Sequence, residues 1–276
     1  MFKPKAIALA LALTSSLFAV GSQAAAPQPS VVIVHGAFAD GSDWGKVVPL
    51  LQAEGIKVTV VQNPLTSLAD DVAATQRVLN NQDNGVVLVG HSWGGTVISQ
   101  VGTDQKVRAL VYVAAFAPDA GQASKDLGKD YPAPPGVKDI AADKNGFLYM
   151  TPQGMATGFA QDLPAAQTAV MAATQGPIRA SAFDDKTSVA AWKGKPTWYV
   201  VAREDRMIQP DLQRAFAKKL KAQVTEVEAS HVPQQSRPAD VAKVIIQAVH
   251  ETQEKTAEVA DATQQPRGPQ NTRNGV

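Results

Sequence analysis

The chain has 276 residues, no cysteine, and nearly equal numbers of basic and acidic residues, 26 and 25. The absence of cysteine excludes disulfides, a thiolate nucleophile and thiolate metal sites. A formal net charge of +1 gives no sign of a surface for nucleic acid or anionic membrane. The length is sufficient for one sizeable α/β domain with a buried core.

Residues 1–26 have the composition of a secretory signal peptide. Lys3 and Lys5 supply a positive start, residues 6–20 are almost entirely apolar, and small residues follow up to Ala26. The apolar run is short for a membrane span and gives way to small and polar residues, which favours a cleaved leader over an anchor. We therefore expect export to the periplasm or the cell exterior, with no membrane span after cleavage.

The other end of the chain is polar. Residues 253–276 are rich in Gln, Asn, Pro, Gly and charged residues, without an apolar period. Such a segment cannot bury enough surface to order itself. We predict a disordered tail there, and a single folded domain over residues 27–252.

Between these ends, short β-branched runs alternate with helical patterns, which is typical of a parallel sheet with crossover helices. Most of the runs are apolar without alternation, as in strands that are covered on both faces. The pattern predicts an α/β fold with a mostly parallel sheet of about six strands and helices on both faces. The expected strands are 31–34, 57–61, 86–89, 109–113, 197–201 and 224–228, and the expected helices are 44–52, 68–79, 96–102, 212–221 and 239–249.

Residues 118–195 interrupt this alternation. They include the proline-rich run 131–136 and one plausible helix at 165–174. A long insertion between strands is usually functional, and ligands of open α/β sheets bind at the carboxyl ends of the strands. We therefore predict a cap over a substrate pocket; the alternative is that its apolar residues form a small core of the cap itself. The expected pocket residues are Phe38, Phe147, Met150 and Phe159, with Tyr149, Met155 and Phe183 as further candidates.

The most informative motif is Gly90-His91-Ser92-Trp93-Gly94. An apolar run that predicts a buried strand leads into it, and a helix-compatible stretch follows. A Gly-x-Ser-x-Gly sequence in this setting predicts a nucleophile elbow, a sharp turn that exposes the serine hydroxyl above the sheet. A Cβ at Gly90 or Gly94 would clash with the neighbouring strand or helix. Ser92 is therefore the candidate nucleophile.

A serine hydroxyl needs a base, and the base needs an orienting acid; in this architecture they follow in the order acid, then histidine. Of four histidines, only His231 follows the last predicted strand. Asp205 follows the preceding strand, with two apolar residues and a proline shortly after it. We choose Asp205 over the adjacent Glu204 and over Asp119, which also follows a strand.

The oxyanion that forms during attack needs preorganised N–H donors. One candidate is the backbone N–H of Trp93, directly after the nucleophile. The second is expected from the loop that follows the first strand, where Gly36 permits a close approach of the backbone. Either Ala37 or Phe38 could supply this N–H, and we prefer Ala37.

These motifs together resemble the α/β-hydrolase superfamily over about residues 29–250. The first predicted strand already carries the loop with Gly36, which is similar to the six-stranded branch of plant methylesterases, hydroxynitrile lyases and small bacterial esterases. Hydroxynitrile lyases of this branch have a threonine in that loop and a lysine directly after the histidine. This chain has Gly36 and Val232 at those positions, which disfavours the lyase reaction.

Together with the N-terminal leader, the resemblance implies an exported serine hydrolase that acts on a small or medium carboxylic ester. A lyase or perhydrolase reaction on the same residues, or a non-catalytic ligand-binding homologue, are the alternatives. The chemistry needs no organic cofactor, and no His/Asp cluster at ligand spacing suggests a metal. The expected partner is a small-molecule ester, and the sequence gives no indication of the oligomeric state.

Overall fold

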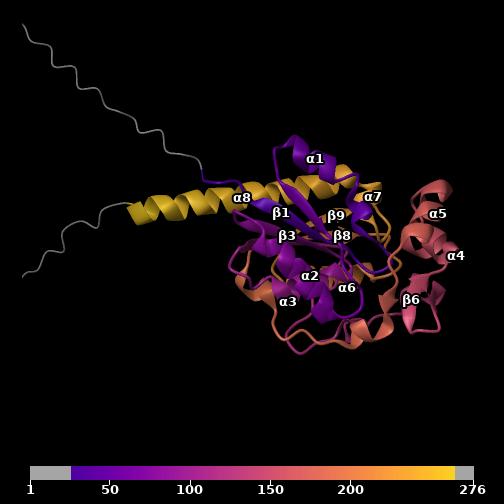
Figure 1. Ribbon diagram of the computed structural model, residues 1–276. Coiled ribbons are helices and arrows are strands. Elements are labelled where there is room, and N and C mark those ends of the chain that lie inside the picture. The colour runs from indigo at the N-terminus through magenta and orange to yellow at the C-terminus, as the bar shows by residue number, and fades with distance from the viewer. Residues whose placement is uncertain (1–25, 265–276) are drawn as a thin grey trace, which may run out of the picture.

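A computed structural model describes residues 26–264 of the chain (Figure 1). Its centre is a six-stranded sheet in the order β2-β1-β3-β4-β8-β9, in which every neighbouring pair is parallel. All six predicted strands are therefore confirmed, and the sheet is entirely parallel. The strands are β1 (Ser30–Val34), β2 (Val58–Val61), β3 (Val86–His91), β4 (Val107–Val113), β8 (Thr197–Ala202) and β9 (Gln223–Val227).

Helices cover both faces of this sheet because its central strands are apolar on both sides (Figure 1). Val32 and Val34 of β1 pack in one core cluster, and Val31 and Ile33 pack in the other. The first cluster is covered by α2 (Leu68–Asn80), α3 (Gly94–Val101) and α6 (Pro210–Lys219). The second is covered by α1 (Val48–Ala53) and α8 (Pro238–Gln264).

Helix α2 illustrates how local sequence sets these elements. The Ser67 side chain caps the helix by accepting the backbone N–H of Asp70. Asp70 and Asp71 lie in the first turn and Arg77 lies in the last turn, where negative and positive charges, respectively, interact favourably with the helix dipole. Leu68 and Leu79 are buried against the sheet. The predicted helix at 68–79 is confirmed.

Helix α8 corrects the prediction of a disordered tail. The helix continues to Gln264, so residues 253–264 are helical. Its first turns are packed against the sheet, and the residues beyond them are mainly Glu, Gln, Lys and Ala, which propagate a helix once it has started. The Gln253 amide also donates to the carbonyl of Ala26 at 2.6 Å. The leader, except Ala26, and the tail beyond Gln264 lie outside the described residues, so export and tail disorder stay predictions.

The segment between β4 and β8 holds short elements that lie together at the right of Figure 1 or close to the main sheet. A small antiparallel sheet has the order β5-β6-β7. The predicted helix at 165–174 is confirmed as α5 (Ala165–Thr174).

Within residues 26–264, no helix has the length and hydropathy needed to cross a membrane. The remaining elements are β5 (Ile140–Ala142), β6 (Phe147–Met150), β7 (Ile178–Arg179), α4 (Pro152–Gly154), the short π-helix η4 (Met155–Phe159), α7 (Pro233–Ser236) and the 3₁₀ helices η1 (Gly41–Trp44), η2 (Ser124–Asp126), η3 (Pro135–Asp139), η5 (Ala180–Asp184) and η6 (Ala191–Gly194).

Candidate active site

Ser92 lies in a strained turn between β3 and α3. Its φ angle is +51°, in the left-handed region that residues other than glycine rarely adopt. The turn is held by the backbone carbonyl of Ser92, which accepts hydrogen bonds from the N–H groups of Gly95 at 3.0 Å and Phe116 at 3.2 Å. The expected nucleophile elbow is present at this position, with the Ser92 hydroxyl facing a cavity.

Glycines allow the elbow to pack this closely. A Cβ on Gly90 would lie 2.6 Å from the carbonyl oxygen of Gly94, and a Cβ on Gly94 would lie 2.3 Å from that of Val34. A Cβ on Gly36 would lie 2.8 Å from the Cβ of Ser92. The loop after β1 therefore touches the nucleophile itself, as the sequence predicted.

Ser92, His231 and Asp205, from distant parts of the chain, form one row of hydrogen-bonded side chains. The Nε2 atom of His231 lies 2.8 Å from the Ser92 hydroxyl, and its Nδ1 atom lies 2.7 Å from Oδ2 of Asp205. Both His231 and Asp205 are buried. Because the carboxylate accepts a hydrogen bond from Nδ1–H, the neutral imidazole presents Nε2 as an acceptor to the serine hydroxyl. This is the arrangement that general-base activation of a serine requires.

The Asp205 carboxylate is oriented by three further donors. Oδ1 accepts the backbone N–H groups of Met207 at 2.7 Å and Ile208 at 3.0 Å, and Oδ2 accepts the amide of Gln213 at 2.7 Å. Gln213 is fully buried on α6 and also accepts the N–H of Ala202 at 3.0 Å. Sequence reasoning missed Gln213, because a glutamine in an amphipathic helix carries no signal that it faces inward.

The alternative acids and histidines lie elsewhere. Asp119 pairs with Lys193 at 2.6 Å on the surface, and Glu204 is exposed. His250 is exposed on α8. His91 lies beside the site, where its Nε2 donates to the carbonyl of His231 at 2.8 Å. His91 thus supports the loop that carries His231 without contacting the Ser92 hydroxyl.

The loop after β1 distinguishes the two candidates for the second N–H donor. The N–H of Phe38 donates to the carbonyl of Gly176 at 3.2 Å and is therefore occupied. Within residues 26–264, the backbone N–H groups of Ala37 and Trp93 have no hydrogen-bond acceptor in the protein. The loop is fixed by His35, whose Nε2 accepts the N–H of Asn63 at 3.0 Å, so that Nδ1 donates to the carbonyl of Gly36 at 2.8 Å. These contacts favour Ala37 over Phe38.

A cavity of about 390 Å³ opens above Ser92 and His231. Phe38 and Phe159, both predicted pocket residues, line it and pack edge to face with ring centroids 6.2 Å apart. Phe159 also packs edge-on against His231 at 5.0 Å. Phe183, a further pocket candidate, and Ala37, the preferred oxyanion-hole residue, also line it. The lining residues that were missed are Phe116, Lys125, Val137, Ile140, Leu148, Ala180, Asp184, Met207 and Ile208.

Phe147 and Met150, the other two predicted pocket residues, do not line this cavity. In strand β6, successive side chains point to opposite faces, and Leu148 is the residue that reaches the cavity. Phe147 therefore points the other way, where the guanidinium of Arg179 lies 4.6 Å from its ring centroid. Met150 is fully buried in the core cluster that also contains Val32 and Leu88 of the main sheet. Met150 is therefore a core residue, in a core that the cap shares with the main sheet.

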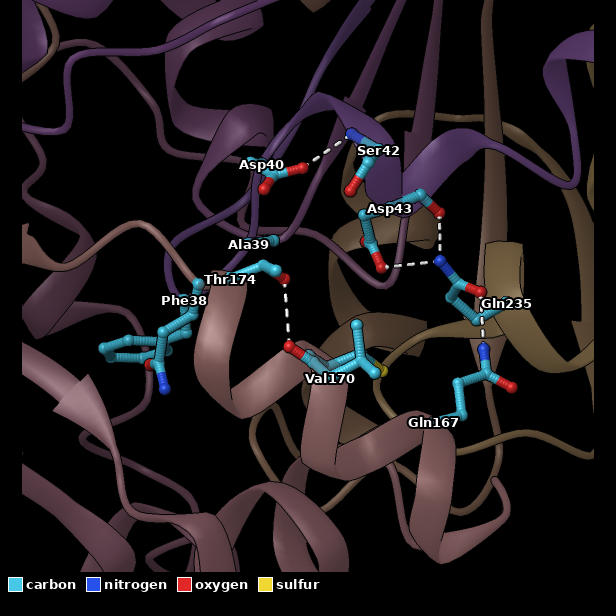
Figure 2. A pocket seen from close by; sticks show the side chains of 11 residues that line it. Phe38, Ala39, Asp40, Ser42, Asp43, Gln167, Val170, Thr174 and Gln235 are labelled. Carbon is cyan, nitrogen blue, oxygen red and sulfur yellow. Dashed lines mark hydrogen bonds between the residues drawn. The ribbon is translucent and has the colours of Figure 1, made fainter.

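A second cavity of about 280 Å³ lies beside the loop that follows β1 (Figure 2). Next to it, the amide of Gln235 donates to the carbonyl of Asp43 at 2.6 Å and accepts from Gln167 of α5 at 2.8 Å. Gln234 donates to the Asp43 carboxylate at 2.5 Å. Burial raises the pKa of Asp43, although these amide hydrogen bonds oppose the shift. The segment just after His231 is thereby tied both to η1 and to the cap.

Two buried histidines predict an acid-sensitive fold. Burial lowers the pKa of His91 well below the ordinary histidine value of about 6.5, and burial also lowers the pKa of His35. The unfolded chain therefore binds more protons than the folded chain below pH 6.5, so stability falls as the pH falls through that value. Between pH 7.5 and 5.5, His91 is expected to remove about 1 kcal/mol from the free energy of unfolding, and His35 adds a smaller loss of the same sign.

Urea unfolding at the two pH values tests this prediction. His91→Gln should lose less stability between them than the unsubstituted protein does, whereas His250→Gln, at an exposed position, should lose as much. An equal loss in the unsubstituted protein and in His91→Gln would contradict the prediction.

Comparisons with known proteins agree with this geometry. The model of the family described as "Alpha/beta hydrolase family" matches residues 31–244. Among curated proteins, the chain is similar to a probable hydrolase R7 of Phoma sp., with 22% identity over 79% of this chain and 97% of that protein. It is also similar to methylesterase 1 of Arabidopsis thaliana, with 26% identity over 66% of this chain and 81% of that protein.

Among solved structures, polyneuridine aldehyde esterase superposes with a TM-score of 0.70 at 22% identity, over 80% of this chain and 99% of that chain. At that identity the likeness concerns the fold. No group of three or more His, Asp or Glu within residues 26–264 could hold a metal ion. The family match covers most of the sheet and spans the Ser92, Asp205 and His231 positions. The chain belongs to the alpha/beta hydrolase family.

Proposed function

We propose that the chain hydrolyses small or medium, uncharged carboxylic esters through an acyl-enzyme intermediate on Ser92. The observation that carries the proposal is the continuous hydrogen-bond chain from Asp205 through His231 to Ser92, with distances of 2.7 and 2.8 Å. It ends at the floor of a cavity large enough for such a substrate. The names of the methylesterase and hydrolase relatives support the same reaction class.

In this mechanism the Ser92 oxygen attacks the ester carbonyl while His231 Nε2 takes the hydroxyl proton. The Asp205 carboxylate holds the imidazole in one tautomer and stabilises the imidazolium that forms. The negative charge on the former carbonyl oxygen is stabilised by the N–H groups of Ala37 and Trp93. The alcohol leaves with the proton from His231, and water then attacks the acyl-enzyme by the same route, releasing the carboxylic acid.

The walls of the cavity support an uncharged, apolar acyl or alcohol group. They are formed mainly by aromatic and aliphatic side chains. The two charged residues on the wall, Lys125 and Asp184, pair with each other at 2.5 Å and are each about half exposed. They therefore offer no unpaired charge to a substrate group. A carboxylate on the substrate would lose its hydration in this cavity without gaining a partner.

A matched pair of esters tests the proposal. The p-nitrophenyl ester of pentanoic acid and the mono-p-nitrophenyl ester of glutaric acid have equal chain lengths but differ in one terminal carboxylate. We expect kcat/KM to be at least about tenfold higher for the uncharged ester, because of the cost of desolvating the charge. Ser92→Ala serves as the blank for both substrates. Equal rates for the two esters would contradict the proposed substrate class, and turnover of neither would contradict the hydrolase activity.

A further inference from the structure

A buried carboxylate lies behind Trp93, the residue that directly follows Ser92. Asp71 of α2 has no solvent exposure. Its Oδ2 accepts the indole N–H of Trp93 at 2.7 Å, and its Oδ1 accepts the backbone N–H of Leu65 at 2.8 Å. Trp93 is itself fully buried. One carboxylate therefore joins α2, the connection before it and the turn that carries the nucleophile.

Keeping a carboxylate here is costly for the fold. Within residues 26–264, no lysine, arginine or histidine forms an ion pair with Asp71. Burial raises the pKa of Asp71 to about 6, although the hydrogen bonds from Trp93 and Leu65 favour the ionised form. An apolar pair of similar volume would fill the same space without burying a charge. A buried acid with this perturbation beside a reactive group points to a role in the reaction.

The position of the Trp93 ring is determined from two sides. Asp71 binds its N–H edge, and Phe183 of the cap packs edge-on against it with centroids 5.3 Å apart. The backbone of Trp93 lies between the strained Ser92 and the first residue of α3. In such a short turn, the placement of the indole also restricts the orientation of the Trp93 backbone. In the proposed mechanism, the backbone N–H of Trp93 donates to the oxyanion.

We propose that Asp71 is a positioning residue for the oxyanion hole, holding the Trp93 indole and thereby the backbone N–H of Trp93 in place. This inference rests on the proposed function, because it presupposes that Ser92 attacks a carbonyl. Asp71 also reaches the cap through Leu65, a left-handed residue with φ of +59° whose carbonyl accepts the N–H of Arg179 at 2.8 Å. The same carboxylate is thus connected, through Leu65, to Arg179, the residue that precedes Ala180 of the cavity wall.

Asparagine is the informative replacement, because two donors converge on Asp71. An ionised carboxylate offers an acceptor to each N–H group, whereas an amide offers one oxygen and turns its own NH₂ toward the other donor. Asp71→Asn therefore keeps the size of the side chain and loses one of the two hydrogen bonds. Trp93→Phe removes the indole N–H from the other side of the same interaction.

The experiment measures kcat and KM for p-nitrophenyl acetate in Asp71→Asn, Trp93→Phe and the double variant. Each single change is expected to lower kcat about 10- to 100-fold, because the misplaced donor is used in the transition state. KM should change by less than about threefold, since ground-state binding does not use this donor. The loss of kcat in the double variant should be no greater than in the less active of the two single variants, because both changes remove the same interaction.

Tyr112→Phe is the matched control. It removes a buried hydrogen bond from an aromatic side chain to the Ser99 hydroxyl at 2.9 Å, in the same core cluster but without a hydrogen bond to Ser92, Trp93 or Asp71. It should lower the thermal midpoint of unfolding and keep kcat. If Asp71→Asn and Trp93→Phe also lower the thermal midpoint and keep kcat, the inference is overturned. It is likewise overturned if their losses in kcat multiply in the double variant.

Trp93→Phe decides the question alone if Asp71→Asn does not fold: a loss in kcat supports the inference, and an unchanged kcat overturns it. Ser92→Ala separates this inference from the proposed function. If Ser92→Ala keeps full turnover, the proposed function fails and the inference fails with it. If Ser92→Ala is inactive while Trp93→Phe equals the unsubstituted enzyme, only the inference fails.

Discussion

Replacing His231 with alanine is expected to lower kcat for ester hydrolysis by about 10⁴- to 10⁶-fold. The hydroxyl of Ser92 lies 2.8 Å from Nε2 of His231, and no other imidazole contacts it within residues 26–264. Without that acceptor, the serine proton has no destination at neutral pH. Asp205→Asn is expected to lower kcat by about 10⁴-fold, because an amide favours the wrong tautomer of the imidazole.

The measurement is the steady-state hydrolysis of p-nitrophenyl esters, with circular dichroism to show that each variant is folded. His250→Ala is the matched control, since it removes an exposed histidine from α8. It should retain the unsubstituted kcat. A folded His231→Ala enzyme whose kcat stays within tenfold of the unsubstituted enzyme would contradict the assigned base.

A methyl group at Gly94 is expected to destabilise the fold by about 3 kcal/mol, at the upper end of overpacking effects. The added Cβ would lie 2.3 Å from the carbonyl oxygen of Val34 and 3.0 Å from that of His35. Both neighbours are backbone atoms of β1 and of the loop that holds Ala37, so neither can move as a flexible side chain can. Relief requires α3 to move away from β1, which would also displace the N–H of Trp93.

Urea denaturation of Gly94→Ala measures this effect. Gly194→Ala is the control, because an added Cβ there has nothing within 4 Å. Its free energy of unfolding should stay within about 0.5 kcal/mol of the unsubstituted protein. The prediction is wrong if Gly94→Ala is as stable as this control.

Local patterns in the sequence were sufficient for the sheet and for the core of the site. Buried parallel strands are continuous apolar runs, and the turn at Ser92 needs glycines on both sides, so both leave marks that are readable one residue at a time. His231 could be found because parallel strands bring their carboxyl ends to one edge, and only one histidine followed the last strand. Asp205 followed from the same argument applied to the preceding strand.

What the sequence did not reveal depends on tertiary contacts. Gln213, Asp71 and Asp43 are polar residues in or beside helices, where polar residues usually face solvent, yet all three are buried and hydrogen-bonded. Their partners are set by packing, and nothing in their neighbours along the chain marks them. The register of the short strand β6 likewise determined that Leu148, and not Phe147, reaches the cavity.

Labelling with a fluorophosphonate tests most directly that Ser92 is an activated nucleophile. The probe phosphonylates a serine only when a base removes its proton, and peptide mapping by mass spectrometry locates the modified residue. We predict one adduct per chain, on Ser92, with a labelling rate at least about 100-fold lower in His231→Ala. An unlabelled enzyme, an adduct on another residue, or equally fast labelling without His231 would contradict the assignment.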